Sequence, residues 1–277
     1  METEKMVLED KDLKKLHETL LIIMDEFGRI CKKHGIPYFL DSGSALGAVR
    51  HKGFIHWDDD VDIGMLREDY LKFMEVAAKE LDKEFFLQTH DTDPNYFRFH
   101  AKIRMNNTFF PEKNTDHLAH RGIFIDIFPF DYVSDDERVA LREIKKARWL
   151  FRFVLFTRPG YKPGVIRKKV IQMVLKLTNY DRNRDRYVKH ITKHFASPTK
   201  HVTCFPYYAL AKKDLVFELN DVRGGNYVEF EDREYQAMQN PDAYLTTMYG
   251  DYMTLPPEED RTYHANGKIV FPGKEAE

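Results

Sequence analysis

Four aspartates occur within five consecutive positions of the segment IHWDDDVDIG, residues 55–64. Carboxylates this close repel one another, so the cluster is destabilising unless a cation compensates it. From Asp60 onward, polar and apolar residues alternate as in a β-strand, which places Asp60 and Asp62 on one face and the intervening apolar residues on the other. One face then offers hard oxygen ligands while the other packs in a core. The alternative is a solvated acidic turn, to which Asp58 and Asp59 would contribute. The alternation with apolar residues favours a Mg²⁺ or Mn²⁺ site of the kind that handles phosphates.

The bulk composition predicts a soluble globular protein. The chain has 277 residues, of which 43% are hydrophobic and 32% charged, enough for one sizeable core or two small domains. Its net charge of −2 gives no overall signal for a polyanion, and no nucleic-acid partner is expected. Two cysteines predict no disulfide framework and favour a reducing compartment. Because the polar N-terminus lacks a signal-peptide core and no run of about 18 apolar residues occurs, the expected location is cytoplasmic.

Apolar periodicity predicts a mixed α/β half followed by a helical half. In the first half we expect helices over 9–34, 45–50 and 68–81, and strands over 38–40, 61–66, 85–89, 97–104 and 123–128. In the second half we expect helices over 136–156, 164–178, 184–196 and 242–249. The change near residue 135 is the candidate boundary between a domain of residues 1–135 and a region of residues 136–277. One continuous domain is the alternative.

A Gly-Ser pair, Gly43-Ser44, stands in a predicted turn between the first strand and the second helix. Glycine lets a backbone approach a ligand closely, and a helix start offers unpaired N–H groups to phosphate oxygens. The alternative is an ordinary helix cap, which the same residues often form. The aspartate strand follows closely, which favours the phosphate-binding interpretation. Between the two lie Arg50, His51 and Lys52, for which a phosphate contact and a solvated surface role both stay open.

A single carboxylate, Asp126, interrupts the apolar segment GIFIDIFPFD of residues 122–131. A lone charge in such a strand is unfavourable unless it is paired or bound to a cation. Two interpretations are open: Asp126 caps a loop or pairs with an arginine such as Arg121, or it is a third metal ligand beside Asp60 and Asp62. In the second case, two ions bridged by three carboxylates would hold a diphosphate and an incoming hydroxyl.

Three segments, in this order, resemble the motifs of the LicD family. They are residues 42–63 (SGSALGAVRHKGFIHWDDDVDI), residues 122–131, and residues 244–257 (YLTTMYGDYMTLPP) followed by His264. The matches are spread over about residues 35–265. Two departures are visible: Ser44 stands where threonine is frequent, which keeps the hydroxyl, and His56 stands where proline is frequent. Neither departure removes a residue proposed as a ligand.

The resemblance implies an α/β (α+β) fold with a nucleotidyltransferase-like mixed sheet core flanked by helices. LicD proteins move phosphocholine from CDP-choline to a sugar hydroxyl of teichoic acid, lipopolysaccharide or a related glycan, and relatives use CDP-ribitol. The implied reaction is therefore transfer from a CDP-alcohol to a lipid-linked glycan, with release of CMP. By this resemblance, Asp60, Asp62 and Asp126 are catalytic metal ligands for two Mg²⁺ or Mn²⁺ ions. Gly43 and Ser44 are, in the same way, implied to bind the phosphates.

The implied chemistry is in-line attack of the sugar hydroxyl on the phosphorus that bears choline. The resemblance leaves open whether Asp126 or Asp60 accepts the proton of this hydroxyl. A choline cation needs aromatic faces or carboxylates nearby. Trp57 is a candidate because it adjoins the aspartate run.

Two other enzyme classes use parts of the same pattern. A glycosyltransferase that uses a nucleotide sugar also needs an Asp-x-Asp motif and a divalent metal, but it needs neither the Gly-Ser turn nor Asp126. A template-free nucleotidyltransferase shares all three elements, but it transfers the nucleotide and releases pyrophosphate. A catalytically inactive binding protein is a further alternative, which the intact carboxylates disfavour.

Residues 141–176 form a basic stretch with eleven Lys or Arg and one acid, Glu143. The same stretch contains aromatic residues, among them Trp149, Phe151 and Phe153. A basic, aromatic-rich helix is typical of an element at a membrane surface, which suits an enzyme with a lipid-linked acceptor at the inner face of the membrane. The alternative is an amphipathic helix with its aromatics in the core and its cations in solvent.

Overall fold

The computed structural model describes residues 9–112, 118–159, 178–206, 214–261 and 263–273. The chain forms two compact units, one of residues 1–128 and 220–277, the other of residues 129–219. The structure thus divides the chain after residue 128 rather than near 135, and it returns the last 58 residues of the chain, 220–277, to the first unit. These residues belong there because their hairpin and helix pack on elements of the N-terminal half, a long-range association without a local sequence pattern.

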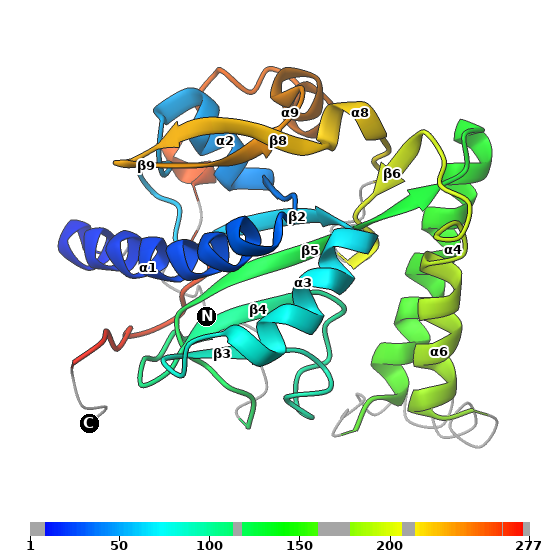
Figure 1. Cartoon of the computed structure of the whole chain (residues 1–277), viewed down its shortest axis with the longest axis horizontal. Helices are drawn as coiled ribbons and strands as arrows, with labels where there is room; N and C mark the ends of the chain where they lie inside the picture. Colours follow the sequence, from blue (N-terminus) through cyan, green and yellow to red (C-terminus); the bar gives the residue numbers. More distant parts are fainter. Residues whose placement is uncertain (1–8, 113–117, 160–177, 207–213, 262, 274–277) are drawn as a thin grey trace. The chain divides into compact units, whose positions relative to one another are not determined.

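The first unit is built on a mixed sheet (Figure 1). The strand order is β1 (Phe39–Leu40), β2 (Asp62–Leu66), β5 (Phe124–Val133), β4 (Ala101–Met105) and β3 (Phe85–Gln88). The pairs β1–β2, β3–β4 and β4–β5 are antiparallel. Apolar side chains of the central strands, such as Ile63, Ile103 and Ile125, are fully buried. The expected mixed α+β class is confirmed.

Helices α1 (Asp10–His34), α2 (Ser42–His51) and α3 (Arg67–Glu80) belong to the same unit. Helix α1 follows the predicted stripe, with Leu16, Ile23 and Phe27 buried. It ends at Gly35, whose φ of 57° is left-handed and whose N–H bonds to carbonyls of the last turn. Helix α2 differs from the prediction: it begins at Ser42, so the expected turn 41–44 is its first turn, because the Asp41 side chain caps it by accepting the Ser42 N–H.

The C-terminal part of the first unit holds the strands β8 (Gly224–Phe230) and β9 (Arg233–Met238), helix α9 (Pro241–Tyr249) and the 3₁₀ turn η1 (Glu258–Asp260). Strand β9 packs near β1, and α9 packs on α2. Isolated bridges join Phe109 to Val270 and Glu112 to Ala265. The last residues of the described chain are therefore tied to the segment that follows β4.

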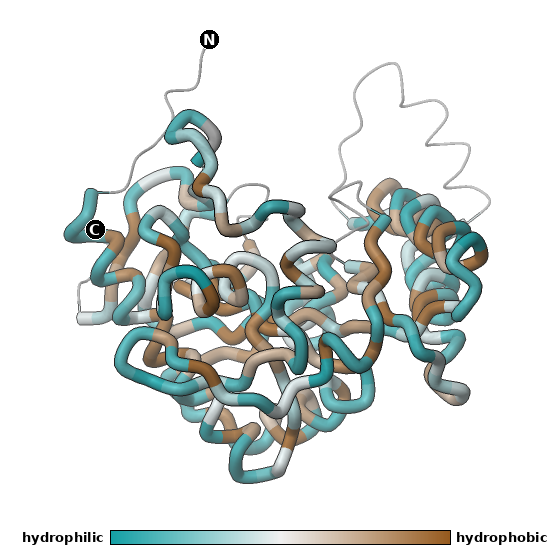
Figure 2. Tube along the Cα trace, turned by 90° about the horizontal axis from the view of Figure 1, so that it is seen from above, coloured by the Kyte–Doolittle hydropathy of each residue, from teal (hydrophilic) through white to brown (hydrophobic). Residues whose placement is uncertain are grey.

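The second unit contains the end of β5, the strands β6 (His201–Thr203) and β7 (Phe217–Glu218), and the helices α4 (Glu137–Thr157) and α6 (Tyr180–Ile191). The short helix α8 (Leu219–Val222) stands at the division. The predicted helix 136–156 is confirmed, and the one expected over 184–196 begins and ends earlier. The helix expected over 164–178 lies almost wholly outside the described residues. Along α4 and α6, hydrophilic and hydrophobic residues alternate (Figure 2). Among the described helices, none has the length and the apolar character that a membrane span requires.

Candidate active site

The carboxylates of Asp60, Asp62 and Asp126 converge on one place. An oxygen of each lies within 4.8 Å of an oxygen of the others. Strand β5 lies beside β2, and the Asp126 N–H donates to the carbonyl of Val61 over 2.8 Å, which sets the third aspartate next to the other two. The predicted convergence is what the structure shows. Metal ligation by these residues stays a prediction.

The cluster is electrostatically unfavourable in the absence of a cation. Burial, followed by repulsion from Asp60 and Asp126, raises the pKa of Asp62 well above its usual range. Burial also raises the pKa of Asp60 to about 6, although the His264 ring opposes the change. The raised pKa values mean that ionisation of these carboxylates destabilises the folded chain. The close spacing of the aspartates in the sequence predicted this repulsion.

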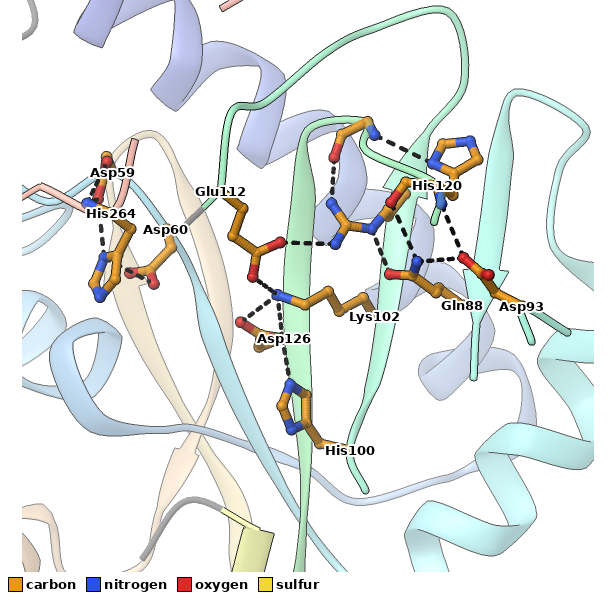
Figure 3. Close-up of polar contacts among 12 residues, drawn as sticks. Asp59, Asp60, Gln88, Asp93, His100, Lys102, Glu112, His120, Asp126 and His264 are labelled. Carbon is orange, nitrogen blue, oxygen red and sulfur yellow. Dashed lines mark hydrogen bonds and ion pairs between the residues drawn. The ribbon is translucent and has the colours of Figure 1, made fainter. Parts of the chain in front are cut away.

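Two basic side chains from β4 and the segment before it hold Asp126 (Figure 3). Lys102 Nζ lies 2.9 Å from Asp126 Oδ1 and donates to Oδ2 over 3.1 Å, and His100 Nε2 lies 3.0 Å from Oδ1. Burial alone would raise the pKa of Asp126, but Lys102 and His100 lower it well below its usual range. Asp126 is thus paired, though with Lys102 and His100 and not with Arg121.

The donor set fits a hard divalent cation. Asp126 Oδ1 is buried and accepts no well-directed hydrogen bond, despite the nearby cationic groups. All three groups offer carboxylate oxygens, which Mg²⁺ and Mn²⁺ prefer. An ion here would also compensate the repulsion that raises the pKa values of Asp60 and Asp62. Asp60, Asp62 and Asp126 are therefore the residues that would hold it.

The C-terminal segment reaches the site through Asp59. The buried Asp59 carboxylate accepts the backbone N–H groups of His264, over 2.8 Å, and Ala265, over 2.7 Å, and lies 3.0 Å from His264 Nδ1. His264 Nδ1 is also 3.2 Å from Asp60 Oδ2. Asp60 and then Asp59 raise the pKa of His264 to about 10, so the ring is cationic at neutral pH. The sequence predicted for Asp59 a supporting role beside the site or a cap on the Trp57 loop, but not these partners. The only signal for His264 was its place after the third motif.

Gly43 and Ser44 pack directly against the aspartate segment. A Cβ atom on Gly43 would lie 2.7 Å from Asp58 Oδ2, so this position accepts only glycine without displacing Asp58. Ser44 Oγ accepts the backbone N–H of Asp62 over 3.0 Å. The structure thus brings the Gly-Ser pair to the carboxylates, as predicted. Phosphate binding by the pair stays a prediction.

A residue that sequence reasoning missed is Asp41, the cap of α2. It is buried and accepts the N–H of Ser42 over 2.8 Å and the hydroxyl of Tyr244, a residue of α9. Burial raises the pKa of Asp41 to about 6. An aspartate directly before a helix start is a common cap, so this role was within reach of the sequence. The contact with Tyr244 was not, because some two hundred residues separate the partners.

The other predicted binding residues have partners away from the three carboxylates. Arg50 Nη1 donates to the carbonyl of Tyr252 over 2.7 Å, and Lys52 Nζ lies 3.2 Å from Glu229 Oε2 at the surface. The His51 ring lies edge-on to that of His56. These contacts anchor the end of α2, and the phosphate role of Arg50, His51 and Lys52 stays a prediction.

The predicted choline contact, Trp57, already carries a cation on its ring. The Arg261 guanidinium lies 4.3 Å from the ring centroid. This arrangement shows that the indole can bind a positive group. A choline head group would have to use the other face of Trp57 or displace Arg261.

We expect Mn²⁺ to raise the melting temperature at about pH 7.5 and to have much less effect at about pH 5. In the metal-free protein, the contribution of protonated Asp60 to stability is complete below the unfolded pKa of about 4 and is lost as the pH rises through the folded pKa of about 6. A cation compensates the ionised form only. Thermal unfolding with and without Mn²⁺ after chelation measures the difference at each pH, and equal shifts at both would contradict a carboxylate site.

Asp59→Asn is expected to lower the free energy of unfolding by about 2 kcal/mol, because charge-assisted hydrogen bonds to His264 and Ala265 are weakened. Asp58→Asn is the matched control. Burial raises the pKa of Asp58 well above its usual range, so removal of its charge should leave stability unchanged or increase it. Urea unfolding of both variants at neutral pH makes the comparison. Equal losses would mean that Asp59 does not anchor the C-terminal segment.

Comparison with known proteins places this site in a family. A family model for the LicD/FKTN/FKRP nucleotidyltransferase domain matches residues 35–153, which include Gly43, the aspartate segment and Asp126. Lipopolysaccharide cholinephosphotransferase LicD of Haemophilus influenzae is 30% identical over 94% of this chain and 97% of its own length. Human ribitol 5-phosphate transferase FKRP is 31% identical over 31% of this chain and 17% of its own length. Human ribitol-5-phosphate transferase FKTN is 30% identical over 32% of this chain and 20% of its own length.

Proposed function

The chain belongs to the LicD family and is a LicD-type phosphotransferase, and we propose that it moves phosphocholine or a related alcohol phosphate from a CDP-alcohol to a sugar hydroxyl. The acceptor is a cell-surface glycan precursor, and CMP is released. The observation that carries the proposal is the convergence of Asp60, Asp62 and Asp126 in a chain that aligns with a cholinephosphotransferase along nearly its whole length.

Choline is the favoured head group. The relative that aligns over 94% of this chain is named a cholinephosphotransferase, whereas the ribitol-phosphate transferases align over about a third of it. The cation–π contact between Arg261 and Trp57 is a physical reason to favour choline, because an indole ring that binds guanidinium is also suited to a quaternary ammonium. A polyol such as ribitol is the alternative, and it would need hydroxyl partners in place of an aromatic face.

In the proposed reaction, the acceptor hydroxyl attacks the phosphorus that bears the alcohol, in line with the departing CMP. A new P–O bond to the sugar forms as the P–O bond to CMP breaks, and the carboxylate of Asp60 or Asp126 accepts the proton of the attacking hydroxyl. Divalent ions, when bound, neutralise the diphosphate and acidify the attacking hydroxyl. Asp60, Asp62 and Asp126 would hold these ions, and Lys102 with His100 fixes the position of Asp126. The first turn of α2, with Gly43 and Ser44, offers backbone N–H groups to the phosphates.

A donor assay tests the proposal and separates the three enzyme classes. The purified protein is incubated with CDP-choline, Mn²⁺ and a lipid-linked glycan fraction, and the nucleotide products are separated by chromatography. We expect CMP, with choline phosphate bound to the glycan, and no CMP after chelation. Release of pyrophosphate from CTP would instead indicate a nucleotidyltransferase, and release of UDP from a UDP-sugar a glycosyltransferase. CDP-ribitol in a parallel reaction decides the head group.

A nucleotide donor and a lipid-linked acceptor meet at the cytoplasmic face of a membrane, where we place the enzyme.

A further inference from the structure

We propose that the outer face of α4 docks on an anionic lipid surface. This basic-aromatic face consists of Arg142, Lys145, Lys146, Trp149, Arg152 and Phe153. The four cationic residues and Trp149 are exposed, and Phe153 is half-buried. Successive members are three residues apart or adjacent, so they share one side of the helix. From Arg142 to Arg152 the face extends over about 15 Å at the usual helical rise.

The opposite side of α4 is a core side. Ala140, Ile144, Ala147, Phe151 and Val154 are buried there, and α4 packs on α6. The alternative that the sequence left open, with the aromatics in the core, is therefore true for Phe151 but not for Trp149. The Trp149 side chain is 56% exposed and packs edge-on against Phe153 at 4.4 Å between ring centroids. An exposed tryptophan among cations is unusual for a merely solvated helix face.

The face has a net positive charge. Glu143, the acid of this part of α4, is buried on the other side and bound by Lys193 and His194 of the same unit. Arg148, which has a carboxylate partner in Asp214, also lies off the face. Among the residues that the structure describes, no carboxylate lies within ion-pair distance of the cations of the face.

These features match an anionic membrane better than a nucleic acid. Each Lys or Arg near an anionic bilayer strengthens binding about fivefold, and tryptophan prefers the depth of the lipid head groups. The face thus combines electrostatic attraction with an aromatic anchor, and α4 would lie flat on the surface. The proposal goes beyond the proposed reaction and does not depend on it, because its residues belong to the second unit and the carboxylates to the first.

Vesicle flotation of the full chain tests the proposal. The vesicles contain about one-third phosphatidylglycerol in phosphatidylcholine, and pure phosphatidylcholine vesicles are the comparison. We expect recovery with the anionic vesicles at low salt, a loss of recovery at high salt, and little recovery with neutral vesicles. No recovery with anionic vesicles at low salt would overturn the proposal, as would binding to a DNA or RNA oligonucleotide in place of vesicles.

A matched pair of triple variants locates the surface. Arg142→Gln/Lys145→Gln/Arg152→Gln should weaken vesicle binding about 100-fold. Lys11→Gln/Lys14→Gln/Lys83→Gln removes the same charge from exposed positions of the first unit and should change binding little. Equal losses in both variants would mean that net charge and not this face governs binding. CMP release from CDP-choline in the absence of vesicles should be unchanged in both, so a failed enzyme assay and a failed docking assay are distinguishable.

Tryptophan fluorescence gives a second readout, because the chain has two tryptophans. On addition of anionic vesicles, we expect a blue shift in wild type and in Trp57→Phe, and no shift in Trp149→Phe. A shift that persists without Trp149 would place the membrane contact elsewhere and overturn the assignment to α4.

Discussion

Asp62→Asn should lower the rate of CMP release by about 10²–10³-fold or more without destabilising the fold. The aspartate is one of three carboxylates whose oxygens lie within 4.8 Å of one another, and asparagine removes its charge while keeping its shape. In the metal-free protein, burial and repulsion raise the pKa of Asp62, so its ionisation at neutral pH works against folding. Loss of that charge should therefore leave the melting temperature unchanged or raise it, while abolishing the increase that Mn²⁺ gives to wild type.

The matched control for this variant is Asp69→Asn. Burial also raises the pKa of Asp69, to about 6, but Asp69 lies on α3 and not in the cluster. We expect full activity and a normal Mn²⁺ response from it. Steady-state rates, thermal unfolding and Mn²⁺ titration of both variants make the comparison. Wild-type turnover in Asp62→Asn would remove the carboxylate cluster from the mechanism.

Lys102→Met should lower the free energy of unfolding by about 3–5 kcal/mol. Lys102 is almost fully buried, and its Nζ lies 2.9 Å from Asp126 and 3.0 Å from Glu112. Methionine keeps much of the volume but leaves the buried Asp126 and the half-buried Glu112 without this cation. Arg104 still pairs with Glu112 in this variant. Asp126 is therefore the carboxylate whose charge compensation the substitution reduces most.

Mn²⁺ should stabilise Lys102→Met more than it stabilises wild type, since an ion on Asp126 replaces the missing positive charge. Urea unfolding with and without Mn²⁺ measures both effects. Lys79→Met is the control, because Lys79 forms a fully exposed pair with Glu75 that solvent screens, so its loss should change stability little. Similar losses in the two variants would show that Lys102 does not compensate the buried carboxylates.

Local patterns in the sequence singled out the three carboxylates, and the resemblance to the LicD family predicted that they converge. Alternation around Asp60 and Asp62 fixes one face of a strand, and an aspartate inside an apolar run, Asp126, needs a compensating charge wherever it lies. The spacing of apolar residues likewise predicted α1 within a residue of its observed bounds. In each case a period of two or of about 3.6 residues, repeated over several positions, specifies which side is buried.

The partners of the cluster were not predictable in the same way. Lys102 compensates Asp126 because the antiparallel register of β4 and β5 sets the two residues directly opposite each other, and a register between distant strands is not written in either strand. His264 and Tyr244 reach Asp59 and Asp41 from the far end of the chain. The expected boundary near residue 135 differed from the observed division for a similar reason. Residues 220–277 join the first unit through long-range tertiary contacts, which no local sequence pattern specifies.

Anomalous diffraction from crystals grown with Mn²⁺ tests most directly whether the three carboxylates form a metal centre. We expect anomalous peaks within coordination distance, about 2.0–2.3 Å, of oxygens from Asp60, Asp62 and Asp126. The peaks should be absent from crystals of Asp62→Asn grown in the same way. Manganese bound at other residues, or no manganese at these carboxylates in an enzyme that is active with Mn²⁺, would contradict the metal site on which the proposed function depends.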